Sequence, residues 1–199
     1  MKSKFKINYK RLVIVAVILS CISFFIYNNQ QYNTYKLGDF GVSMKVKKDY
    51  SSQKVKSSLL NLYNENKDMS VNVKYLGEAF WKEDEMDSIM DEYIRLISAM
   101  KFDSNIDDVS YRKEKVGFKE VGIVEITVNN VADSSSVLAL LTHKDNGYLA
   151  IEVYGPTSVM QKNKKEAESI LKSVRFGKNK HDYSLDKRTT SGDETPTEV

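Results

Sequence analysis

The chain has 199 residues, 41% of them hydrophobic and 29% charged, a composition typical of a globular protein. Its formal net charge is +3, but five basic residues ahead of the first apolar segment supply +5 and leave −2 for the remainder. This nearly neutral remainder gives no electrostatic case for nucleic-acid binding. The five basic residues are Lys2, Lys4, Lys6, Lys10 and Arg11.

Residues 12–27 form an uncharged apolar segment directly behind this basic cluster, and three interpretations of it stay open. A secretory signal cleaved after Ser23 would leave a new apolar terminus, which argues against it. A lipoprotein signal would attach a lipid to Cys21, although the residues behind this cysteine remain apolar. A retained transmembrane helix fits best. Its sixteen residues would span about 24 Å, and the basic residues that flank it can snorkel to compensate for the ~30 Å hydrocarbon layer.

The favoured interpretation predicts the topology of the whole chain. The basic segment, residues 1–11, lies in the cytoplasm, residues 12–27 cross the lipid bilayer of the cell membrane, and residues 28–199 lie outside it. Cys21 is the only cysteine, so an intramolecular disulfide and a cysteine-based metal site are excluded.

Beyond the apolar segment, the pattern predicts a short linker and then one extracytoplasmic domain, residues 37–176. The linker, residues 28–36, is largely polar and has no periodicity. The domain opens with a strand over residues 40–46. A hairpin follows, with its arms in residues 57–66 and 69–76 around the turn "NKD".

The second arm of this hairpin has the period of two that is typical of a strand. Val71, Val73 and Tyr75 face one way, whereas Asn72 and Lys74 face the other. This alternation predicts a half-buried strand.

A change of period then predicts an amphipathic helix from Asp84 to Lys101. Its apolar residues recur at intervals of three and four and form a stripe wide enough to cover a sheet. Acidic residues occupy its first turn, where the helix dipole favours them: Asp84, Glu85 and Asp87.

Four strand-like segments follow in two hairpins: residues 109–116 with 120–128, and residues 135–143 with 148–155. Asn146-Gly147 supplies the positive φ of a tight turn in the second hairpin. Residues 137–141 are apolar on both faces, which predicts a central strand with cover above and below.

A second helix is predicted from Thr157 or Ser158, and the tail, residues 177–199, is predicted to be disordered. The order of elements is three strands, a helix, four strands and a helix. It predicts an α+β fold, an antiparallel sheet of about six to seven strands sandwiched by two helices and preceded by one N-terminal transmembrane helix.

The order and hydrophobic spacing of these elements resemble the PsbP/DcrB-like fold family, an α-β-α sandwich shared with a eukaryotic Ran-binding nuclear-import factor. The resemblance covers residues 37–176: the strand "FGVSMKV", a hairpin before the long helix, "EVGIVEITV", "GYLAIEVYG" and the closing "SILKSVRF". It implies a membrane-anchored bacterial member of this family that acts as a binding subunit. The chain departs from the family at Lys47-Lys48, where a proline often follows the first strand.

The sequence contains no recognisable catalytic motif, and no cofactor is expected. A hydrolytic triad needs a histidine or a comparable base beside its nucleophile. Of the two histidines, His143 closes a strand beside a turn and His181 lies in the tail. The three serines at residues 134–136 are interpreted as a polar hairpin loop rather than as a nucleophile cluster.

No metal site is predicted. The acidic group of Glu83, Asp84, Glu85 and Asp87 lacks the alternating oxygen ligands and the glycine of a calcium loop. A helix start explains this group instead. The acidic residues of "NIDD", residues 105–108, are interpreted as part of a turn.

Trp81, the only tryptophan, is the candidate binding residue. It follows Phe80 in the connection before the predicted helix, where both rings could simply pack beneath that helix. In the functional interpretation Trp81 anchors a partner protein or a glycan, because large aromatic rings concentrate binding energy. Tyr148 and Tyr154 share one strand face and are interpreted as core or helix-facing residues.

Three functions remain open, and the sequence favours the first. It is a non-catalytic, membrane-anchored extracytoplasmic domain that binds a protein or another component of the cell envelope. The second is a carboxylate-based envelope hydrolase, which needs two acids converging in a cleft. The third, a lipoprotein with a structural role in the envelope, depends on Cys21.

Overall fold

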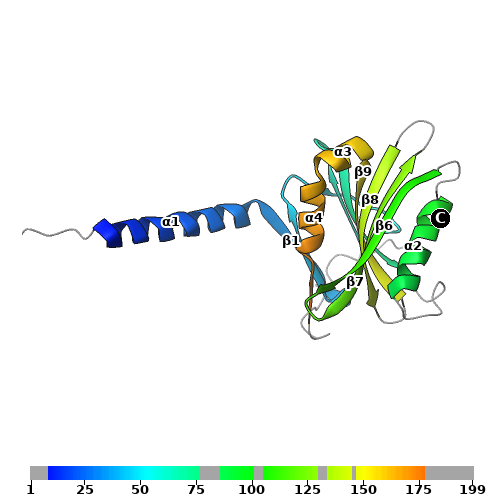
Figure 1. Cartoon of the computed structure of the whole chain (residues 1–199), viewed down its shortest axis with the longest axis horizontal. Coiled ribbons are helices and arrows are strands. Elements are labelled where there is room, and N and C mark those ends of the chain that lie inside the picture. Colours follow the sequence, from blue (N-terminus) through cyan, green and yellow to red (C-terminus); the bar gives the residue numbers. More distant parts are fainter. Residues whose placement is uncertain (1–8, 77–85, 101–104, 130–133, 145–146, 178–199) are drawn as a thin grey trace, which may run out of the picture.

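The computed structural model describes residues 9–76, 86–100, 105–129, 134–144 and 147–177. A long helix, α1 (Tyr9–Gln30), projects from a body made of sheet and shorter helices (Figure 1). Over the described residues, no helix combines the length and the apolar character needed to cross a membrane.

The body is built on a seven-stranded antiparallel sheet with the strand order β3-β4-β5-β9-β8-β7-β6. Two of its tight turns need a left-handed backbone: Asp68 has a φ of 51° between β4 and β5, and Gly117 has a φ of 64° between β6 and β7. The strands are β3 (Ser51–Ser52), β4 (Leu60–Asn64), β5 (Met69–Leu76), β6 (Asn105–Val116), β7 (Lys119–Asn129), β8 (Ser134–Lys144) and β9 (Gly147–Pro156).

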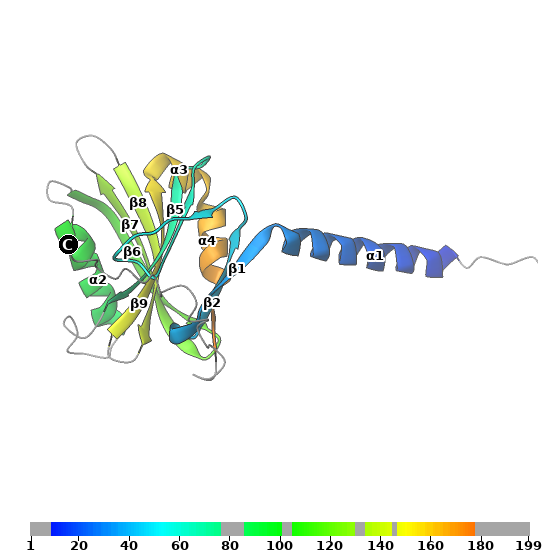
Figure 2. The same ribbon diagram turned by 180° about the vertical axis from the view of Figure 1, so that it is seen from behind.

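Helices cover both faces of this sheet (Figures 1 and 2). One face carries α2 (Met86–Met100), and the other carries α3 (Thr157–Lys162) and α4 (Lys164–Lys172). Side chains alternate along each strand, so that in β9 Ile151 points toward α4 while Ala150 points toward α2. The sheet is therefore the middle layer of an α-β-α sandwich.

Each face of the sheet has its own hydrophobic core. The core under α2 combines one stripe of the helix with one face of β7, β8 and β9. Its largest fully buried members are Ile89, Met90, Tyr93, Ile126, Leu141 and Tyr148. The core under α4 is larger and includes Met44, Leu62, Met69, Leu140, Leu149 and Ile151.

A second, three-stranded sheet with the order β1-β2-β10 lies beside α4. Its central strand, β2 (Val42–Lys47), pairs antiparallel with β1 (Tyr32–Leu37) and with β10 (Arg175–Phe176). Only Gln31 separates α1 from β1, and its carbonyl accepts a hydrogen bond of 3.0 Å from the backbone N–H of Lys48. This bond ties the end of α1 to the body.

The predicted α+β class is confirmed, with seven antiparallel strands in the main sheet and helical cover on both faces. The helix predicted over residues 84–101 is α2, and the doubly apolar strand predicted at residues 137–141 lies in β8, between β7 and β9. The second predicted helix is interrupted at Asn163, whose side-chain amide donates to the carbonyl of Val159 at 2.9 Å.

The beginning of the predicted domain differs from the structure. Residues 28–36 are not a linker, because α1 continues to Gln30 and β1 begins at Tyr32. The strand predicted at residues 40–46 is present as β2, but it belongs to the second sheet, and the short β3 lies at the edge of the main sheet instead. The polar strand β1 was missed because pairing with β2, rather than apolar periodicity, forms it.

Two predicted loops are also strands. Residues 105–108 begin β6, with a register irregularity between Ile106 and Asp108. The serines at residues 134–136 begin β8, which confirms the strand predicted over residues 135–143 and contradicts the interpretation of these serines as a hairpin loop. Strand pairing provides partners for their backbones, and side-chain hydrogen bonds to neighbouring hydroxyl groups provide partners for Ser134 and Ser136.

Candidate functional site

A groove of about 610 Å³ opens on the α2 face of the sheet, beside the C-terminal half of α2. Strands β5, β8 and β9 form its floor. Ile97 and Tyr154 contribute apolar surface, while Ser70, Asn72, Lys74 and Glu152 contribute polar groups. A roomy apolar groove with a few converging polar groups is the usual form of a ligand site in a protein.

The groove contains a buried carboxylate, Glu152, whose side chain is 4% exposed. The hydroxyl of Tyr93, on α2, donates to its Oε1 at 2.9 Å. The ammonium of Lys74 lies 3.0 Å from its Oε2, and the amide of Asn72, its direct neighbour on β5, donates to the same oxygen at 3.4 Å. Glu152 is therefore a buried carboxylate with a cation and two hydrogen-bond donors around it, and such partners are what offset the cost of burying a carboxylate.

Tyr93 stays a neutral hydrogen-bond donor. Burial, followed by the negative charge of Glu152 and the hydrogen bond to it, raises the pKa of the Tyr93 hydroxyl well above its ordinary value. The hydrogen bond from Tyr93 to Glu152 thus joins α2 to β9.

Asn72 holds an unsatisfied acceptor in this groove. The residue is 4% exposed, and its Oδ1 accepts no hydrogen bond within the part of the chain that the structure describes. A buried acceptor without a donor is costly, so such an atom marks a place where a ligand N–H or O–H is favourable. Lys74 is 22% exposed at its side chain and carries two further N–H groups beyond the one that faces Glu152.

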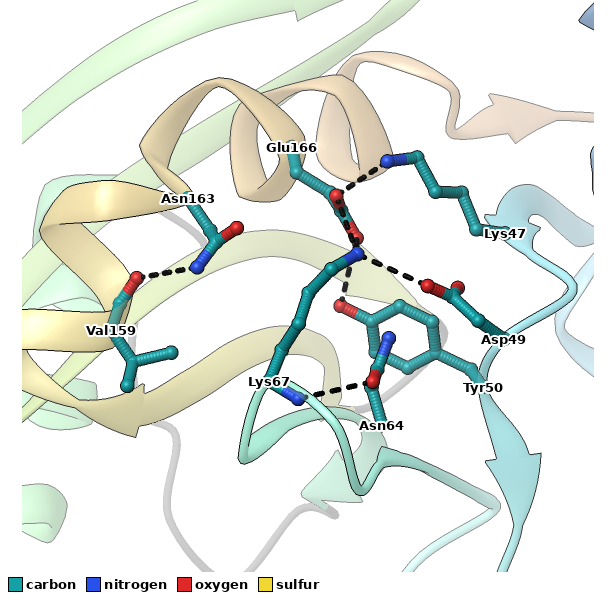
Figure 3. Close-up of polar contacts among 8 residues, drawn as sticks. All are labelled: Lys47, Asp49, Tyr50, Asn64, Lys67, Val159, Asn163 and Glu166. Atoms are coloured by element: carbon teal, nitrogen blue, oxygen red, sulfur yellow. Dashed lines mark hydrogen bonds and ion pairs between the residues drawn. The ribbon is translucent and has the colours of Figure 1, made fainter.

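A second polar cluster lies under α4 and is shown in Figure 3. Its centre is Glu166, on α4, whose carboxylate lies 2.6 Å from the ammonium of Lys47 and 2.9 Å from that of Lys67. Tyr50 donates its hydroxyl to Glu166 at 3.3 Å, and Asp49 lies 3.1 Å from Lys67. The cluster joins β2, the segment behind it and the β4–β5 turn to the helix.

The ion pairs of Glu166 with Lys47 and Lys67 give this cluster a structural role. Burial opposes ionisation of Glu166, but hydrogen bonds and charges from Lys47 and Lys67 outweigh it and hold the pKa of the Glu166 carboxyl below its usual value. Burial likewise disfavours the charge of Lys67, yet its two carboxylate partners raise its pKa. Because Glu166 already accepts from three donors, it has little capacity left for a ligand.

The structure describes only some of the residues that the sequence pattern singled out. His143 is exposed on β8, away from the groove. Asp87 of the proposed acidic group pairs with Lys113 at 2.8 Å. Cys21 is exposed on α1. Trp81, Glu83, Asp84, Glu85, His181 and the Asn146 turn lie outside the described residues.

Sequence reasoning missed the groove and its carboxylate. Glu152 is the one charged residue in the apolar run of β9, and that isolation was a usable signal. Asn72 and Lys74 were assigned to the polar side of a half-buried strand, but this side lines the groove, and Asn72 is buried there beside Glu152. Tyr148 and Tyr154 do face the α2 core, as interpreted.

No family model matches the sequence, and no curated protein matches it. Several solved structures, in contrast, are similar to the body of this protein. The body is similar to the solution structure of cyanobacterial PsbP (CyanoP) from Synechocystis sp. PCC 6803, with a TM-score of 0.56, 12% identity, and coverage of 73% of this chain and 92% of that chain. It is also similar to the Saccharomyces cerevisiae Ran-binding protein Mog1p, with a TM-score of 0.52, 10% identity, and coverage of 73% and 95%.

These comparisons define the class of the domain as an α-β-α sandwich around an antiparallel sheet. At such low identity the likeness concerns the fold. The chain has the PsbP/Mog1-like fold, which confirms the resemblance drawn from its element order.

The Lys74–Glu152 pair generates a stability prediction. Lys74→Met leaves a buried carboxylate without its cation and should cost about 2–4 kcal/mol of unfolding free energy. Adding Glu152→Gln should recover most of that loss, because the uncompensated charge is then gone. Urea denaturation of the two variants measures this coupling. Lys113→Met, which breaks an exposed pair, should stay within about 0.5 kcal/mol of wild type. Equal losses in the single and double variants would contradict the assignment.

The Glu166 cluster generates a pH prediction. Because the folded pKa of Glu166 is depressed, its stabilising effect is present above the ordinary carboxyl pKa and is lost as the pH falls through and below it. Glu166→Gln should therefore cost about 1–2 kcal/mol at neutral pH, and the difference from wild type should shrink in acid. Denaturation curves of wild type and variant, recorded at neutral pH and at an acid pH below the ordinary carboxyl pKa, test this prediction. Glu168→Gln, two residues along α4, is the control, since its pair with Lys172 is exposed. A deficit that stays constant with pH would contradict the prediction.

Proposed function

We propose that the protein is a non-catalytic binding domain that receives a protein partner in the α2 groove and is held at the cell membrane by α1. The observation that carries the binding function is the groove itself, with an unsatisfied acceptor at Asn72 beside the buried Lys74–Glu152 pair. The fold supports it, since one protein of similar structure is described as Ran-binding.

The chemistry of the groove favours binding over catalysis. A carboxylate-based hydrolase needs two acids with separate protonation roles. Asp68 and Glu152 both line the groove, but Asp68 is exposed and accepts a hydrogen bond of 3.0 Å from Tyr63. Glu152 is paired with Lys74 and accepts a hydrogen bond from Tyr93, so both of its carboxylate oxygens are already engaged by side chains of the protein. Trp81 remains a proposed anchor for the same partner.

Over its described residues α1 does not have the length and apolar character of a typical membrane span; the proposed tether is supported instead by the surroundings of this helix. Every large apolar side chain that the structure describes on this helix is exposed, from 49% at Ile22 to 61% at Tyr27. They lie at positions 13–15, 17–19, 22 and 27 and so point in several directions around the helix, which is the pattern of a helix solvated by lipid. The side chains of residues 12 and 24–26 lie outside the described part of the chain. The basic side would remain in the cytoplasm and the body would lie outside.

The tether predicts that the full chain pellets with membranes after carbonate extraction and that external protease digests the body. Val15→Arg with Ile18→Arg should release it, since each arginine costs about 2.5–3.5 kcal/mol at the centre of a bilayer. Leu59→Arg, on an exposed site of the body, is the control and should stay attached. Intact mass decides the fate of Cys21: 22.8 kDa for the retained chain, with lipidation heavier and cleavage lighter. Wild-type protein in the soluble fraction would overturn the tether.

The binding function predicts a partner contact confined to the groove. A photo-crosslinking phenylalanine analogue at Tyr154, in the groove, should give a discrete adduct in native membranes. The same analogue at Tyr111, exposed at 55% on β6 outside the groove, should not. Asn72→Leu keeps the size of the side chain but removes the acceptor, so it should abolish the Tyr154 adduct. Adducts that are the same at both sites, or that persist with Asn72→Leu, would contradict the proposal.

A further inference from the structure

The two helical faces of the body differ in their position relative to α1. Figures 1 and 2 show α4 and β1 on the side from which α1 projects, whereas α2 lies on the opposite side of the sheet. The hydrogen bond from Lys48 to the carbonyl of Gln31 holds this arrangement at the base of α1. A membrane into which α1 inserts would therefore face α4 rather than α2.

The same two faces carry opposite charge. The described residues of α2 include three acidic side chains and one arginine. Those of α3 and α4 include four lysines and two glutamates. The two helical layers thus differ in charge, and the positively charged layer of α3 and α4 lies on the side from which α1 projects. Such a difference in charge orients a protein near a charged surface.

A pocket of about 400 Å³ lies on the basic face, beside the junction of α1 and β1. Tyr32, the second residue after α1, forms part of its wall together with Lys47, Lys162, Lys165, Glu166 and Ser169. Because β1 follows α1 after one residue, this pocket lies close to the level at which α1 meets the body.

Two lysines of the pocket have no carboxylate partner. Lys164 pairs with Glu125 at 2.8 Å and Lys172 pairs with Glu168 at 3.2 Å. Lys47 is paired with Glu166. Within the described residues, Lys162 and Lys165 make no ion pair, and both are exposed. They are the uncompensated charges of this face.

We propose that this pocket binds the phosphate of an anionic phospholipid headgroup, with Lys162 and Lys165 as the cations. Lysine binds phosphate as a point charge, and a tyrosine at the end of a membrane helix sits at headgroup level. Screening limits such attraction to ~8–10 Å at physiological salt, so the position of the pocket beside α1 is essential. The inference rests on the proposed tether. It turns the α4 face toward the bilayer and the α2 groove away from it.

The test uses the full chain in bilayer nanodiscs of phosphatidylcholine, with or without phosphatidylglycerol, followed by amide hydrogen exchange. Exchange in α4 should slow by about five-fold or more when phosphatidylglycerol is present, while α2 should not change. The protection should disappear at high salt. Lys162→Gln with Lys165→Gln should abolish it. Arg95→Gln with Lys113→Gln removes the same charge from the α2 side and should leave it intact.

Each result has a distinct meaning. A chain that enters neither type of nanodisc contradicts the tether. A chain that enters both but shows equal exchange in α4 overturns the headgroup site. Protection of α4 by inorganic phosphate in phosphatidylcholine nanodiscs, at the level reached with phosphatidylglycerol, would also overturn it, because the pocket would then bind free phosphate. Loss of protection in the Arg95 and Lys113 control would mean that the protection depends on the net charge of the protein, and it would overturn the assignment to this pocket.

Discussion

The central strands β8 and β9 must be covered on both sides, and this constraint organises the molecule. Leu140 and Ile151 point to one face, and Leu141 and Ala150 point to the other, all of them fully buried. A sheet with apolar side chains on both faces is stable only as a middle layer. The sheet therefore needs a helical layer on each face. The two layers differ in their charge, in the cavity beside them and in their distance from α1.

Glu152 is the exception to this apolar middle layer, and it locates the binding surface. A buried carboxylate is tolerated only where donors and a cation are built around it, which here requires Tyr93 from α2 and Lys74 from β5. Glu166, under the other helical layer, is also saturated, but its partners come from loops and turns that it holds in place. The first cluster opens on a groove with an unsatisfied acceptor, while the second closes a junction between elements. The two carboxylates thus differ in role, with Glu152 lining a groove and Glu166 joining structural elements.

The fold was predictable where one period dominates a segment. The three- and four-residue spacing of α2 and the doubly apolar run in β8 specify burial by themselves. The segment that became β1 has no such pattern, and it is a strand only because β2 offers it hydrogen bonds. The edge position of β3 likewise depends on its pairing with β4, and the break at Asn163 involves a local side-chain hydrogen bond to Val159 that apolar periodicity does not show.

The candidate site was less accessible to sequence reasoning than the fold. Glu152 and Asn72 are 80 residues apart in the chain and become neighbours only through the β5–β9 pairing. Alternation in β5 correctly separated Asn72 from Val71, but it could not show that Asn72, on the polar side, is buried as well. The pairing of Glu166 with Lys47 and Lys67 joins three elements and leaves no trace in local spacing.

The junction between α1 and the body also has a mechanical consequence. β1 pairs with β2 through six antiparallel residue pairs, from Tyr32 with Lys47 to Leu37 with Val42. A force that pulls α1 away from the body runs along β1 and loads these pairs together in shear, rather than opening them one after another. Tension on α1 is therefore transmitted through β1 to the second sheet, and through β2 to the packing around α4.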